Sequence, residues 1–128
     1  MSSGLMAYSV DLGALPDDYT RAHCDAYGSF LDNRPFYPVK YWWFAEVDQA
    51  LKELGVTAVR MDSLWTGGGA GEEWFAGQVR EAAEQAAGIS AERVNALEDY
   101  SMRESVHAVL EWIRYAAARG HGIVGFYH

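Results

Sequence analysis

The chain contains 128 residues, with 10 Lys and Arg against 18 Asp and Glu, which gives a formal net charge of −8. The length suits a single domain over 1–128, and a hydrophobic fraction of 50% excludes an intrinsically disordered chain. Cys24 is the only cysteine, which excludes an intrachain disulfide scaffold, and the acidic balance argues against nucleic acid or an anionic membrane as the main partner.

The lone cysteine and the amino-terminal stretch both favour the cytoplasm. An unpaired cysteine suits a reducing compartment, and residues 1–15 lack the basic start and long apolar run of a secretory signal. No window of the sequence contains the roughly eighteen apolar residues of a membrane span. We therefore expect a cytoplasmic protein that does not bind a membrane and folds without a metal or another cofactor.

The first half of the chain predicts a strand, a helix, a connection and a second helix. Apolar side chains alternate over 5–12, as in a half-buried strand. Pro16 suits the first turn of a helix, and apolar residues then recur at helical spacing over 19–30. Two prolines make 32–38 a connection, and the next helix is expected over 43–54, ended by a glycine at position 55.

The second half predicts a strand, further helices and a last strand. Alternation over 56–62 indicates a strand, and the glycine-rich segment 66–71 is followed by a helix expected to begin at Glu72. Ser90 is expected to cap a short helix, and the residues Ser101 to Glu104 match a capping box at the start of a longer one. A final strand is expected after Gly120.

The order of these elements predicts an α+β domain. A small sheet of three or four strands packs against three to five helices in a single layer, because each amphipathic face needs an apolar partner. Helical segments separate successive strands, so parallel pairings are possible. The order of the strands stays open.

An unusual aromatic segment is the first candidate site. Six rings fall within 36–44, and consecutive aromatic residues cannot all face one core. We expect some of them to form a binding surface, since Trp and Tyr are enriched where an apolar body meets a polar rim. The bland alternative is that these rings only wrap the core. The residues assigned to this surface are Phe36, Tyr37, Tyr41, Trp42, Trp43 and Glu46, with Trp65 and the nearby Asp48.

A second possibility is a small-molecule enzyme. The aromatic segment would then line a pocket and the glycine-rich segment would act as its lid, although an ordinary linker is the commoner role of such a loop. Acid/base work needs titratable side chains that converge on one cleft. The candidates by residue type and position are Tyr8, Asp11, His23, Arg60 and Asp62.

Metal binding and cysteine chemistry find little support in the sequence. Glu104, His107 and Glu111 share one helix face, but a single Glu-x-x-His pair lacks the second copy that di-iron sites use. His23, Cys24 and Asp25 are adjacent, and adjacent helical residues point apart. We therefore expect no metal site.

Three patches resemble a family of small, uncharacterised bacterial domains: 4–12, the run Phe36-Tyr37-Pro38 together with 44–51, and 122–127. The resemblance implies a cytoplasmic α+β domain and brings no established activity, catalytic residue or cofactor. The middle of the chain departs from it, because a glycine run and a helix stand where the family is associated with a proline-rich acidic loop. Small families of this kind often include immunity proteins that bind toxins, which is an analogy.

The leading hypothesis is therefore an acidic protein-binding domain, of the kind that inhibits a basic partner protein. Net negative charge speeds the encounter with such a partner, and aromatic side chains anchor the complex. The small-molecule enzyme is the alternative. A third hypothesis is a homo-oligomeric structural subunit.

Overall fold

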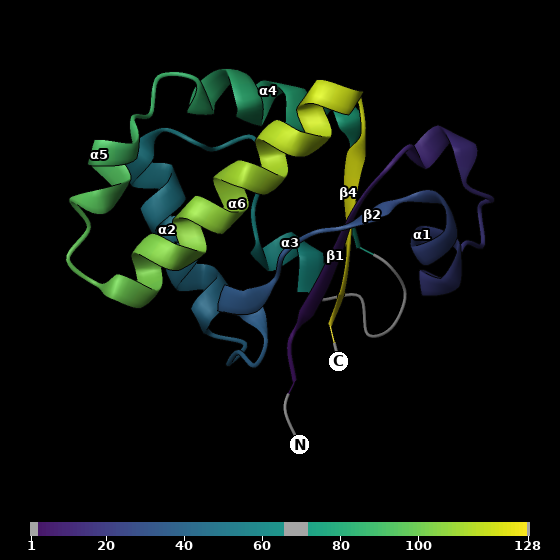
Figure 1. Cartoon of the computed structure of the whole chain (residues 1–128), viewed down its shortest axis with the longest axis horizontal. Coiled ribbons are helices and arrows are strands. Elements are labelled where there is room, and N and C mark those ends of the chain that lie inside the picture. Colours follow the sequence, from purple (N-terminus) through teal and green to yellow (C-terminus); the bar gives the residue numbers. More distant parts are fainter. Residues whose placement is uncertain (1–2, 66–71, 128) are drawn as a thin grey trace.

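The computed structural model describes residues 3–65 and 72–127, and within them one antiparallel sheet of four strands forms the centre of the fold (Figure 1). The order across the sheet is β2-β1-β4-β3, and every neighbouring pair is antiparallel. The fold class is α+β, as predicted, whereas the possibility of parallel pairing is wrong. The strands are β1 (Leu5–Val10), β2 (Ser29–Phe30), β3 (Glu72–Trp74) and β4 (Gly122–Tyr127).

Six α-helices and two short 3-10 turns connect these strands in the described part of the chain. None of these helices combines the length and the hydropathy that a bilayer crossing requires. The helices are α1 (Arg21–Tyr27), α2 (Trp43–Leu54), α3 (Asp62–Trp65), α4 (Ala76–Ala86), α5 (Ala91–Asn95) and α6 (Tyr100–Arg119), and the 3-10 turns are η1 (Leu12–Ala14) and η2 (Arg34–Phe36).

The main core lies between one face of the sheet and the helices α2, α4 and α6. Leu5 and Ala7 of β1 and Ile123 of β4 point into it, as the two-residue period of a strand requires. On the helical side the core takes in buried residues such as Leu110 and Ile113 of α6. The long helix α6 therefore joins the sheet to the other helices.

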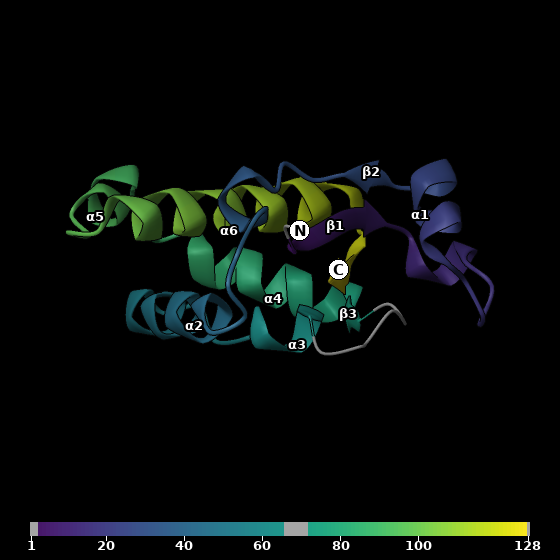
Figure 2. The same cartoon turned by 90° about the horizontal axis from the view of Figure 1, so that it is seen from below.

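A smaller core lies on the opposite face of the sheet. Tyr8 and Val10 of β1 and Val124 of β4 point to this side, where Cys24 of α1 packs against them. Figure 1 and Figure 2 show α1 across the strands from the larger group of helices. The prediction of a single helical layer thus holds only for the larger face.

Local signals place several helix ends correctly. The helix predicted over 43–54 is α2, and Gly55 ends it with a φ of 100°. The short helix α5 begins after Ser90, whose side chain accepts a hydrogen bond from the N–H of Arg93. The predicted capping box at Ser101 is wrong, because Asp99 accepts the hydrogen bond from the Met102 N–H and the helix begins one residue before Ser101.

The strand predicted over 56–62 is wrong. The N–H groups of Thr57 and Ala58 donate to Oε1 of Gln85, at 2.9 and 3.0 Å, and those of Met61 and Asp62 donate to the Asp48 carboxylate. Side-chain oxygens therefore accept hydrogen bonds from backbone N–H groups that would donate to a neighbouring strand in a sheet. Residues 62–65 form α3 instead.

Two other predicted helix starts are also wrong. The first helix begins at Arg21, after a Thr20 whose N–H donates to Nδ1 of His23 at 3.0 Å, and it ends before Phe30, which belongs to β2. The helix expected at Glu72 begins only at Ala76, because 72–74 pair with β4 as a strand.

Candidate functional site

The aromatic segment divides between the core and the surface. Phe36 and Phe44 are fully buried and stack with ring centroids 6.1 Å apart. Trp43 is half-buried, and its Nε1 donates to Oγ of Ser105 at 2.9 Å. In contrast, Tyr41 and Trp42 are 61% and 54% exposed.

The beginning of α2 explains this division. Phe44, Val47 and Leu51 occupy the inward face of the helix, at steps of three and four residues. Trp42 precedes the first helical residue and lies outside that face, as does Tyr41. The expectation that the interior cannot absorb every ring is therefore confirmed. The assignment of Phe36 to a binding surface is wrong, because its side chain is fully buried in the core.

The other residues assigned to the surface have different positions. Tyr37 is 38% exposed, and Glu46 in the first turn of α2 is also exposed. Asp48 is half-buried and accepts hydrogen bonds from backbone N–H groups at the start of α3, so its carboxylate has a structural role. The Trp65 side chain and the glycine-rich segment 66–71, the proposed lid, lie outside the described residues.

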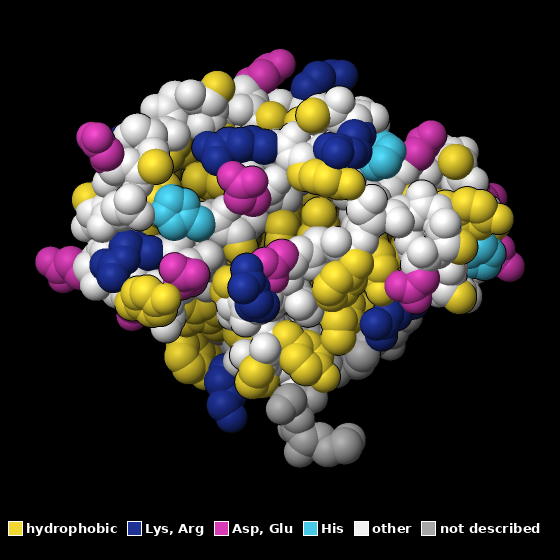
Figure 3. All heavy atoms as spheres, in the orientation of Figure 1, with side chains coloured by type: hydrophobic (Ala, Val, Ile, Leu, Met, Phe, Trp, Pro, Cys, Tyr) yellow, Lys and Arg dark blue, Asp and Glu magenta, His cyan; other side chains and the backbone are white. Residues whose placement is uncertain are grey.

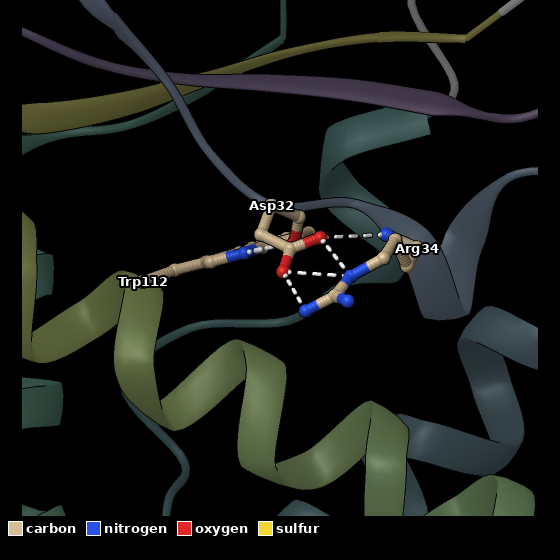
Figure 4. Close-up of polar contacts among 3 residues, drawn as sticks. All are labelled: Asp32, Arg34 and Trp112. Carbon is tan, nitrogen blue, oxygen red and sulfur yellow. Dashed lines mark hydrogen bonds and ion pairs between the residues drawn. The ribbon is translucent and has the colours of Figure 1, made fainter.

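A groove of about 600 Å³ lies between the segment 32–35 and the first four turns of α6. Trp112 of α6 fastens the two walls together, because its Nε1 donates to the backbone carbonyl of Asp32 at 2.9 Å (Figure 4). The residues lining the groove are Asp32, Arg34, Pro35, Tyr100, Ser101, Glu104, His107, Ala108, Glu111 and Trp112.

Acidic side chains outnumber basic ones in this groove. The lining contains three carboxylates and one basic side chain, that of Arg34. The Nε and Nη2 atoms of Arg34 donate to the Asp32 carboxylate at 2.6 to 2.9 Å (Figure 4). These hydrogen bonds hold the pKa of Asp32 below its ordinary value. The two remaining carboxylates belong to Glu104 and Glu111 on α6. The acidic and basic residues of the lining, three acids and one base, give it a formal net charge of −2.

A smaller pocket of about 290 Å³ continues the groove toward the aromatic segment. It is lined by two prolines, Val39, Lys40, Trp42 and Trp43, and it shares Pro35 and Ser101 with the groove. Tyr100 at the start of α6 is 67% exposed. We call the groove, this pocket and the adjoining Tyr41 the groove surface.

The groove surface belongs to a face of mixed character. Figure 3 shows acidic and basic side chains scattered along α6, with hydrophobic side chains between them. Further hydrophobic side chains gather along the lower edge of this view, over the region where η2 and the beginning of α2 lie in Figure 1. Exposed rings beside charged groups are typical of a protein interface.

The five acid/base candidates do not converge. Asp11 accepts a hydrogen bond from the Gly13 N–H, and His23 accepts one at the start of α1, so both stabilise local turns. Arg60 and Asp62 form an ion pair at 3.9 Å near α3. The strand expected over 56–62, which would have carried both residues, does not form.

Tyr8 instead belongs to a polar cluster that the sequence analysis missed. Its hydroxyl donates to Oδ1 of Asp25 at 2.7 Å and accepts from Nε of Arg21 at 3.0 Å. Arg21 and Asp25 lie four residues apart on α1, a spacing that brings side chains to one helix face and would have been the signal. The Tyr8 side chain is 1% exposed, and this burial raises its pKa. Its hydroxyl therefore links α1 to the sheet.

Neither the cysteine nor the histidine on α6 forms a reactive site. Burial raises the pKa of Cys24 to about 11, which keeps it as an unreactive thiol at neutral pH. His107 lines the groove, and its Nε2 lies 2.9 Å from Oδ1 of Asn95. Among the described residues, no three His, Cys, Asp or Glu side chains are arranged to hold a metal ion.

Comparison with known protein families places most of the chain in a family. The model of a domain of unknown function, DUF7691, matches residues 19–128. The chain belongs to this family. No curated protein and no solved structure matches it.

DUF7691 membership agrees with the resemblance to a small uncharacterised family, and it assigns no activity to the chain. The groove of this DUF7691 chain lies wholly within the matched segment. Seven of its lining residues were not among the candidates considered from the sequence. Only the paired Asp32 and Arg34 offered a signal, since oppositely charged residues beside a proline turn fix the course of a loop. The seven are Asp32, Arg34, Pro35, Tyr100, Ser101, Ala108 and Trp112.

Proposed function

We propose that the chain is a cytoplasmic, acidic protein-binding domain that inhibits a basic partner protein through the groove surface. The observation that carries this proposal is the exposure of Trp42 and Tyr41 beside a groove with a net charge of −2. Large rings held outward from a rigid helix start lose little conformational freedom on binding, so they make effective anchors.

Charge supports the same choice of partner. The chain has a formal net charge of −8, and Glu46 adds another exposed carboxylate close to the aromatic segment. Such a surface attracts a basic protein over a distance of about one Debye length, roughly 8 Å at physiological ionic strength. The partner's basic side chains would meet the carboxylates, and its apolar side chains would cover the rings.

The enzyme hypothesis gains no comparable support from the described residues. Its acid/base candidates are divided among β1, η1, α1 and the region of α3, and Tyr8, Asp11 and His23 each serve a structural hydrogen bond. General acid/base catalysis needs such groups within hydrogen-bond reach of one substrate.

The test uses affinity capture followed by a binary binding measurement. The wild-type chain, the Tyr41→Ala/Trp42→Ala variant and the control Tyr27→Ala are immobilised and exposed to lysate of the source cells. Tyr27 is 70% exposed on α1, far from the groove surface, so it controls for the loss of an exposed ring. Captured proteins are identified by mass spectrometry, and purified candidates are titrated by calorimetry over a salt series.

The proposal expects a basic protein that binds the wild type and Tyr27→Ala equally. The double variant should lose roughly thirtyfold or more in affinity, because each anchoring ring contributes at least about 1 kcal/mol. Binding should also weaken as salt is raised. A partner held equally well by the double variant would refute the assignment of the surface. Light scattering on the free chain tests the homo-oligomer hypothesis, which a monomer would dismiss.

A further inference from the structure

The spacing of the two groove carboxylates on α6 carries information about what they bind. Glu104 and Glu111 are seven residues apart, so they lie on the same side of the helix and about 10.5 Å apart along its axis. Both side chains are exposed and both line the groove. They therefore present two negative charges in a row along one wall.

The Glu104 carboxylate is available to a ligand, whereas a ligand at Glu111 replaces an exposed ion pair. Within the described part of the chain, Glu104 makes no hydrogen bond or ion pair that would occupy it, and Glu111 pairs with the exposed Arg114 at 3.5 Å. Arg34, the basic residue of the groove, already donates through two of its nitrogens to Asp32. The hydrogen bonds to Asp32 raise the pKa of Arg34, and the charge of Glu104 adds a smaller contribution.

The rest of the lining suits an extended ligand with apolar edges. Ala108 lies between the carboxylates on α6, and Pro35 forms part of the opposite wall. Tyr100 lies near the first carboxylate, and the Trp42 pocket continues from Pro35. Polyproline II segments dock in grooves lined by aromatic rings, because such segments are already ordered before binding.

We infer that the groove binds a polyproline II segment of the partner that carries arginines three residues apart. A polyproline II helix has three residues per turn and rises about 3.1 Å per residue, so such arginines share one side at a spacing of about 9.3 Å. That spacing approaches the separation of Glu104 and Glu111. An ordinary extended strand places same-side residues only about 6.7 Å apart and fits less well. The inference rests on the proposed function, since it names the partner element that the groove surface takes.

The guanidinium group suits the site better than an ammonium group. It donates to a carboxylate through two parallel N–H groups and stacks its plane on aromatic rings. Tyr100, which is 67% exposed, supplies a ring near Glu104. A lysine has the same charge and would still be attracted to the carboxylates. It would lack the paired N–H groups and the planar group that stacks on a ring.

The test uses two fluorescein-labelled peptides of identical composition. One consists of three Arg-Pro-Pro repeats, and the other has three consecutive arginines followed by six prolines. Each is titrated with the wild-type chain and read by fluorescence anisotropy. Glu104→Gln/Glu111→Gln is the test variant, and Glu81→Gln/Glu84→Gln removes the same charge from exposed positions on α4, outside the groove.

The inference expects the repeat peptide to bind the wild type more tightly than the block peptide. The groove variant should weaken the repeat peptide roughly two- to thirtyfold, the range that two exposed ion pairs provide, and the α4 variant should leave it nearly unchanged. Replacing the arginines of the repeat peptide by lysines should also weaken binding. Circular dichroism and thermal unfolding confirm that the variants fold alike.

Three outcomes would overturn the inference: equal affinity for both peptides, equal weakening by the α4 variant, or no binding of either peptide. Equal weakening would mean that only the overall negative charge attracts the peptides. None of these outcomes touches the capture experiment, which depends on Tyr41 and Trp42 and on a whole partner protein. A partner that requires these rings while the peptides fail would leave the proposed function in place and remove only the groove ligand.

Discussion

Replacing Tyr8 by Phe tests whether its hydroxyl is a structural link or a catalytic group. The substitution removes one oxygen and keeps the ring, which contacts Phe30 and Phe126 edge to face at 5.4 and 6.1 Å. The lost oxygen joins Asp25 and Arg21 of α1 to the central strand β1. We expect the fold to remain and the free energy of unfolding to fall.

The magnitude follows from the two hydrogen bonds that disappear. Each involves a charged group, and such bonds contribute about 1.5–3 kcal/mol, which sets an upper limit of about 6 kcal/mol for the pair. Much of this is recovered, because Asp25 is exposed and regains water in the variant. The phenylalanine ring also avoids the cost of burying a hydroxyl. A net loss of about 1–2 kcal/mol is expected.

Urea unfolding followed by tryptophan fluorescence measures this loss. With a typical slope of about 2 kcal/mol per molar, the midpoint should fall by about 0.5–1 M with no change in slope. Tyr27→Phe on α1 is the matched control, since its side chain is 70% exposed and should leave the midpoint in place. A loss below about 0.3 kcal/mol would refute the linking role, and one above about 4 kcal/mol would show that the ring had repacked.

Three further predictions concern packing, pH and reactivity. In Gly125→Ala the new Cβ would lie 2.6 Å from the Leu64 carbonyl oxygen, so urea unfolding should show a loss of about 1–3 kcal/mol in the free energy of unfolding. Gly77 in α4 has open space around it, so Gly77→Ala should raise the free energy of unfolding by about 0.5–1 kcal/mol. Burial raises the pKa of Asp48 above 3.8, so the folded state holds this proton to higher pH than the unfolded state. The stability of the wild type relative to Asp48→Asn should therefore decrease as the pH rises above 3.8, and a relative stability that increased would contradict the assigned direction. Because the pKa of Cys24 is about 11, its thiol should react with a disulfide reagent at about pH 8 at least roughly a hundredfold more slowly in the folded than in the unfolded chain, and equal rates would mean that the thiol is accessible.

Helix ends were predictable where a single local signal decides them. Gly55 and Gly120 end α2 and α6 with positive φ, which the residue type alone suggests. The first strand and the last strand were also predictable in place. The half-burial expected over 5–12 is wrong, because β1 contributes buried side chains to the cores on both faces of the sheet. The segment 56–62 shows the limit of such patterns. Its alternation resembles that of β1, but Gln85 and Asp48, distant in sequence, satisfy its backbone donors.

The candidate site was predictable only in part. The crowding of rings in 36–44 requires that some be exposed, and Tyr41 and Trp42 are. The groove was not predictable. Its walls come from 32–35 and 100–112, and no pattern in the sequence indicates that these two segments lie side by side. The contact that joins them is a hydrogen bond from an indole to a backbone carbonyl, and a backbone acceptor carries no residue-type signal.

The central position of β1 bears on where the domain begins. The family match starts at residue 19, yet β1 at Leu5–Val10 is the strand to which both β2 and β4 are hydrogen-bonded. A fragment that begins at residue 19 would lack β1. The strand β2 would then have no hydrogen-bonded neighbour, and β4 would have an unpaired edge at which two copies could associate. Shortened versions prepared for crystallography or binding work should therefore retain the residues from Ser3 onward.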